Sequence, residues 1–70
     1  MRKKVMILAG GNDQCALIEE LRRYFKGNVE IILVDMSDKV KAISYADKFL
    51  KISTMDKTAV LFAASEEKIN

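Results

Sequence analysis

The chain has 70 residues, 50% of them hydrophobic and 31% charged, which is enough for one globular domain and no more. Twelve Lys and Arg residues against ten Asp and Glu leave a net charge of +2, too balanced to indicate a nucleic-acid-binding protein. One cysteine and no histidine exclude an internal disulfide and a closed zinc site of Cys and His ligands. Residues 1–70 are therefore expected to form a single domain.

The first residues predict a soluble, cytoplasmic protein. Arg2, Lys3 and Lys4 precede an apolar run that is too short for a membrane span or for the core of a signal peptide. We interpret the basic cluster as a solvated chain end rather than a nucleic-acid contact. The single thiol fits a reducing compartment. Neither a membrane nor a nucleic acid is an expected partner.

Lys4–Ala9 predicts a strand that is apolar on both faces, as in a parallel sheet covered by helices. Asn12 or Asp13 can cap the helix that follows. The apolar residues of this helix share one face and are Leu17, Ile18, Leu21, Tyr24 and Phe25. Gly27 predicts the end of the helix, because glycine readily adopts the left-handed conformation of a helix stop.

The middle of the chain predicts two further strands. Val29–Asp35 is mostly apolar and closes on an acid. Lys39–Ala46 predicts a short helix or helical turn, and Lys48–Ile52 predicts the third strand. The lysines of this third strand suit a sheet edge that must not pair with other chains.

A last helix is predicted from Asp56 to about Lys68, with Ser53 or Thr54 as its cap. The alternation predicts an α/β protein with a Rossmann-like open parallel sheet of three strands, ordered 3-2-1. This order places the first strand at an edge, although Val5–Ala9 is the most apolar segment and carries no charge. Because such a strand is typical of the middle of a sheet, we expect a fourth strand to pair with it. That strand is missing from this chain or is supplied by another chain.

The turn at residues 10–13, Gly-Gly-Asn-Asp, follows the first strand at the edge where open parallel sheets bind ligands. The start of the next helix offers backbone N–H groups to an anion, and Asp35 ends the second strand where dinucleotide-binding units place an acid. The spacing does not match G-x-G-x-x-G, since Cys15 stands where the third glycine would fall, and no P-loop motif is present. A ligand-binding turn and a purely structural turn both stay open.

No catalytic or metal-binding residue is predicted. Cys15 has no histidine to serve as its base, so we interpret it as a small residue packed against the sheet. Asp35 and Asp38 together offer too few oxygens for a calcium site.

The segments KVMILAGGNDQCALIEELRR and VEIILVDMSDKVKAISYADKFLKISTMDKTAVLFAASEEKIN resemble the N-terminal, or pre-ATP-grasp, domain of the ATP-grasp superfamily. The nearest group is the carbamoyl-phosphate-synthase-like or carboxylate–amine ligases. The likeness extends across essentially the whole chain and rests on the order in which several features follow one another along it. These are the glycine turn followed by Gln14, the acid Asp35, the segment Tyr45–Phe49, the helix start at Asp56 and the ending at residues 66–69.

The resemblance implies a function as well as a fold. Such enzymes use ATP to activate a carboxylate as an acyl phosphate, which an amine then attacks, and they hold ATP and magnesium between two later domains. The N-terminal domain packs on those domains and helps to form the acceptor-substrate side of the cleft. The residues that this resemblance would place in the cleft are Gly10, Gly11, Asn12 and Gln14, with Asp35 at its rim. The chain alone would hold no cofactor and would be inactive, and its partners would be the remaining ATP-grasp domains.

The chain departs from the family pattern in two ways. It stops before the expected fourth strand, and Phe62 stands where the family helix usually has a polar residue. Both departures favour an excised domain or a fragment of a longer protein. Two other functions stay open: a small Rossmann-like module that binds a nucleotide or dinucleotide, and an interaction domain that assembles through its exposed strand edge. A homodimer through the first strand would be an example of the latter.

Overall fold

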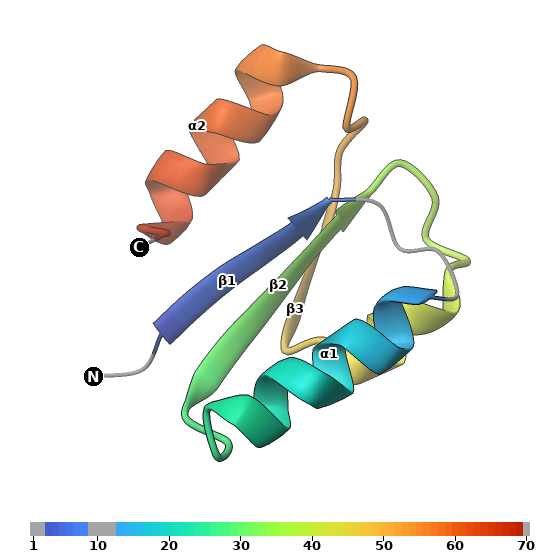
Figure 1. The fold of residues 1–70 in the computed structure, drawn as a ribbon. Coiled ribbons are helices and arrows are strands. Elements are labelled where there is room, and N and C mark those ends of the chain that lie inside the picture. Colours follow the sequence, from blue (N-terminus) through green and yellow to red (C-terminus); the bar gives the residue numbers. More distant parts are fainter. Residues whose placement is uncertain (1–2, 9–12, 70) are drawn as a thin grey trace.

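Strands and helices alternate along the chain in the computed structural model, which describes residues 3–8 and 13–69 (Figure 1). The elements are β1 (Lys3–Leu8), α1 (Asp13–Tyr24), β2 (Val29–Asp35), the 3-10 helix η1 (Lys41–Tyr45), β3 (Lys48–Lys51) and α2 (Lys57–Glu67). The three strands form one parallel sheet. The predicted α/β class with three parallel strands is therefore confirmed.

The sheet has β2 in its middle, between β1 and β3. Leu8, the last residue of β1, pairs with Val34, so β1 and β2 end at the same edge of the sheet. Pairing of β2 with β3 begins at Ile32, opposite Lys48. The carboxyl ends of the strands are thus gathered on one side of the sheet.

Helices cover both faces of the sheet, with α1 and η1 on one side and α2 on the other (Figure 1). Ile31 and Leu33 point to the α1 side and form a core with Ile18 of α1. Ile32 and Val34 alternate with them and are equally inaccessible to solvent, so the α2 face is also closed over β2. Burial on both faces explains why β2 is a continuous apolar run rather than an alternating one.

A left-handed turn ends α1. Gly27 has a φ of +83°, and its N–H donates to the carbonyl oxygen of Arg22 at 2.8 Å. Lys26, just before it, is also left-handed, with a φ of 53°. The predicted role of Gly27 as the helix stop is confirmed.

Asp56 caps α2, and the prediction of Ser53 or Thr54 as the cap was wrong. The Asp56 side chain accepts a hydrogen bond from the N–H of Ala59 at 3.1 Å. Ser53 instead stabilises the preceding turn, because its Oγ accepts from the N–H of Met55 at 3.2 Å. The helix ends at Lys68, which is left-handed with a φ of 57°. Neither α2 nor α1 is long and apolar enough to cross a bilayer, and the same holds for every helix in the described ranges.

Candidate functional site

The carboxyl edge of the sheet is where the sequence predicts a ligand site. Of the predicted residues, Asp35 and Gln14 can be placed, whereas Gly10, Gly11 and Asn12 lie outside the described residues. Asp35 is half-buried at the end of β2, directly after the Val34 position that β1 reaches. Gln14 is half-buried in the first turn of α1, which starts at this same edge (Figure 1).

Asp35 has a structural role in the turn that follows β2. Its Oδ1 accepts a hydrogen bond from the N–H of Ser37 at 2.8 Å, and its carbonyl oxygen accepts from the N–H of Ile52 at 3.0 Å. Carboxylates often form this bond two residues ahead, because it replaces a backbone hydrogen bond in a tight turn. One carboxylate oxygen of Asp35 is therefore committed to the turn.

The loop after β2 is exposed and lightly charged. Lys51 Nζ lies 3.7 Å from Asp38 Oδ2, and both side chains are more than half exposed. Ser37 Oγ accepts a hydrogen bond from the N–H of Lys39 at 3.2 Å. Because solvent screens such an ion pair, it contributes little to stability. The carboxyl edge therefore presents the exposed Asp38–Lys51 ion pair and, beside it in the chain, the exposed Lys39.

The described side chains contain no group of three or more Cys, Asp or Glu residues placed to hold a metal ion. Cys15 is half-buried and packs against the apolar core under the sheet. This placement agrees with its interpretation as a packing residue.

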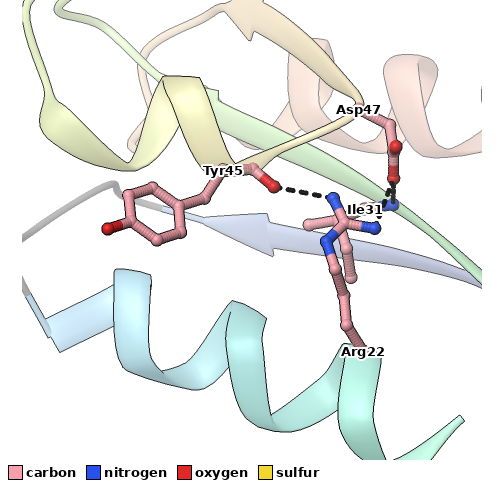
Figure 2. Close-up of polar contacts among 4 residues, drawn as sticks. All are labelled: Arg22, Ile31, Tyr45 and Asp47. Atoms are coloured by element: carbon pink, nitrogen blue, oxygen red, sulfur yellow. Dashed lines mark hydrogen bonds and ion pairs between the residues drawn. The ribbon is translucent and has the colours of Figure 1, made fainter. Parts of the chain in front are cut away.

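A connected polar cluster lies at the opposite, amino end of the sheet, just before β3 begins (Figure 2). Arg22 of α1 donates to the carbonyl oxygen of Tyr45 at 2.6 Å and lies 3.2 Å from Asp47 Oδ2. The same Asp47 oxygen accepts a hydrogen bond from the N–H of Ile31 at 2.7 Å. We call these four residues the Arg22–Asp47 cluster. It ties α1, η1 and β2 together, away from the predicted ligand edge.

Sequence reasoning missed the Arg22–Asp47 cluster. The sequence places Asp47 within the segment Tyr45–Phe49 and Arg22 within the predicted first helix, and no pattern links the two residues. The available signal was an acid directly before a strand, where it can accept a hydrogen bond from a neighbouring strand that starts earlier.

A second polar contact anchors the end of α2 over the amino end of the sheet. Lys48 Nζ of β3 lies 2.5 Å from Glu67 Oε2, and Lys4 Nζ of β1 donates to the carbonyl oxygen of Glu67 at 2.9 Å. The hydrogen bond with Glu67 raises the pKa of Lys48 above the ordinary lysine value. Glu67 thus connects two strands that are not neighbours in the sheet.

No protein-family model matches the chain, and no curated protein matches it.

Proposed function

We propose that this chain is the amino-terminal, substrate-side domain of an ATP-dependent carboxylate–amine ligase of the ATP-grasp type. The observation that carries the proposal is the position of α2 relative to β1. After β3, which forms one edge of the sheet, α2 crosses the face opposite α1 (Figure 1). The end of α2 then contacts the other edge, where Lys4 of β1 donates a hydrogen bond to the carbonyl oxygen of Glu67. Such a crossover is what a doubly wound sheet uses to reverse its strand order.

The side of β1 that faces away from β2 has no strand beside it within residues 3–8 and 13–69. At the end of α2, the left-handed Lys68 turns the backbone, and the N–H of Ile69 donates to the carbonyl oxygen of Ala64 at 3.1 Å. A fourth strand parallel to β1 would begin there. It would complete a Rossmann-like sheet in which the turn after β1 lies at the switch in strand order, where ligands bind such sheets.

In this proposal the glycine turn forms the acceptor-substrate side of the cleft. Gly10 and Gly11 let a substrate approach backbone donors, and Asn12 and Gln14 bind a carboxylate or amide. Asp35 lies at the rim with one oxygen held in its turn. ATP and magnesium belong to the later domains of the enzyme, so the chain alone is inactive.

The test starts from the gene that encodes the chain. We expect its reading frame to continue into an ATP-binding core, and we expect the whole product to release ADP only when a carboxylate and an amine are both supplied. Replacing Gln14 with Ala should raise the KM for the acceptor and leave the KM for ATP unchanged. Glu19→Ala, on the same helix but on its exposed face, is the matched control.

Two results would contradict the ligase proposal. One is a reading frame that lacks an ATP-binding core. The other is tight binding of NAD by the 70-residue chain in a calorimetric titration, which would favour a dinucleotide-binding module. The chain alone should bind neither ATP nor NAD measurably.

A further inference from the structure

One side of α1 carries an exposed apolar surface. Leu17, Glu20, Leu21, Tyr24 and Phe25 line an open hollow of about 360 Å³, which we call the α1 hollow. Leu17 is 43% exposed and Tyr24 is 79% exposed. The rings of Tyr24 and Phe25 meet edge-on, with their centroids 4.9 Å apart. The spacing i, i+3, i+4, i+7 is the one through which a helix commonly contacts another helix.

The other elements on this side of the sheet leave the α1 hollow open. The 3-10 helix η1 reaches α1 at Arg22, which bonds to the carbonyl oxygen of Tyr45. At 3.6 residues per turn, Arg22 lies roughly 140° around the helix from Leu17. Ile18, which is fully buried against the sheet, lies between them on the helix surface. The hollow therefore faces away from η1.

We infer that the α1 hollow binds α1 of a second copy of this chain, in an antiparallel pair around a two-fold axis. A two-fold interface uses the same surface twice, so each copy supplies the side chains that fill the hollow of the other. With the axis beside Glu20 and Leu21, Leu17 lies opposite the partner's Tyr24, and Tyr24 opposite the partner's Leu17. This interface goes beyond the proposed ligase role and does not use the edge of β1.

Charge complementarity favours a second copy as the partner. Glu20 and Arg23 form an ion pair on the flank of the hollow that faces away from the sheet, and their side chains are 68% and 70% exposed. A two-fold axis across antiparallel helices brings this flank of both copies together with its direction reversed. Glu20 then lies within about 3 Å, measured along the helix axis, of the level of the partner's Arg23, which a flexible arginine side chain can span. The surface is thus its own electrostatic complement.

Sedimentation equilibrium of the full chain tests the pairing. We expect a reversible dimer, and we expect Tyr24→Glu to raise its dissociation constant by at least about tenfold, because a charge replaces an aromatic side chain that the dimer would bury. Tyr24 is largely exposed, so this variant should keep the circular dichroism spectrum of the native chain. Phe62→Glu is the matched control, since Phe62 is 67% exposed on α2, and it should leave the dimer unchanged.

Swapping the charges of Glu20 and Arg23 distinguishes this arrangement from nonspecific association. Glu20→Lys should weaken the dimer several-fold, because it places a lysine beside the partner's Arg23, and adding Arg23→Glu should restore the native affinity. A chain that stays monomeric at about 1 mM would overturn the proposal. A dimer that persists in Tyr24→Glu would overturn the proposal as well. If such a dimer were lost in Leu8→Lys, the contact would be assigned to the edge of β1 instead.

Discussion

Asp47 and Ile31 are joined by two hydrogen bonds. The N–H of Asp47 donates to the carbonyl oxygen of Ile31 at 2.9 Å, and the N–H of Ile31 donates to Asp47 Oδ2 at 2.7 Å. Ladder pairing between β2 and β3 starts one residue later, at Ile32 and Lys48. The Asp47 side chain therefore supplies an acceptor to β2 where β3 has not yet begun, and it extends the pairing by one residue.

The first prediction concerns this side-chain acceptor. Asp47→Ala should lower the free energy of unfolding by about 1–3 kcal/mol, because the N–H of the buried Ile31 loses its partner. Urea denaturation followed by circular dichroism measures the change. Asp38→Ala is the control, since the Asp38–Lys51 pair is exposed at 3.7 Å, and it should change stability by less than about 0.5 kcal/mol. Equal losses in the two variants would show that Asp47 acts only as a surface charge.

The second prediction concerns the coupling between Arg22 and Asp47. Their side chains are 33% and 35% exposed, so solvent screens the ion pair and limits its coupling to about 0.5–1 kcal/mol. A double-mutant cycle with Arg22→Met and Asp47→Ala measures this energy directly. Arg22→Lys should lose part of it, because one ammonium group cannot reproduce the forked geometry that contacts Asp47 and Tyr45 together. A coupling energy of zero between Arg22 and Asp47 in this cycle would contradict the prediction.

The parts of the fold that the sequence predicted depend on local patterns. The apolar run of β2 requires cover on both faces wherever it lies, and Gly27 suits a left-handed helix stop regardless of the rest of the chain. The cap of α2 was harder, because Ser53, Thr54 and Asp56 all favour cap positions within four residues. The choice depends on where the helix starts, which tertiary packing decides.

The polar contacts were not predictable in the same way. The Arg22–Asp47 cluster joins Asp47 to Ile31, which lies 16 residues earlier, and no periodicity links the two. The sequence did predict that the carboxyl ends of the strands lie at one edge of the sheet, because parallel strands end on the same side. The turn formed by Asp35 shows why the chemistry of that edge was not: the same carboxylate suits a ribose, a substrate rim or its own backbone.

The third prediction concerns left-handed residues. Gly27→Ala should cost about 1 kcal/mol of unfolding free energy, although a methyl group there would meet no other atom within 4 Å, because the φ of +83° is strained for any residue with a Cβ. Lys68→Gly should instead stabilise the chain by about 0.5–1 kcal/mol, since glycine adopts the φ of 57° without strain. Thermal unfolding of both variants checks the opposite signs. A stabilised Gly27→Ala variant would contradict the role of Gly27.

The last prediction concerns alkaline pH and the contact between Lys48 and Glu67. Because the hydrogen bond with Glu67 raises the pKa of Lys48 above 10.5 in the folded chain, the folded state holds the Lys48 proton more tightly than the unfolded state does. The stabilisation by this contact is therefore complete below pH 10.5 and is lost as the pH rises through the folded pKa.

The variant Glu67→Gln tests this pH dependence, because it removes the carboxylate but keeps the backbone carbonyl oxygen of residue 67 that accepts a hydrogen bond from Lys4. Urea denaturation should show the native chain more stable than Glu67→Gln near neutral pH, with the difference shrinking above pH 10.5. Lys48→Met should reproduce the behaviour of Glu67→Gln, whereas parallel pH profiles of the native chain and both variants would show that the contact makes no difference to stability.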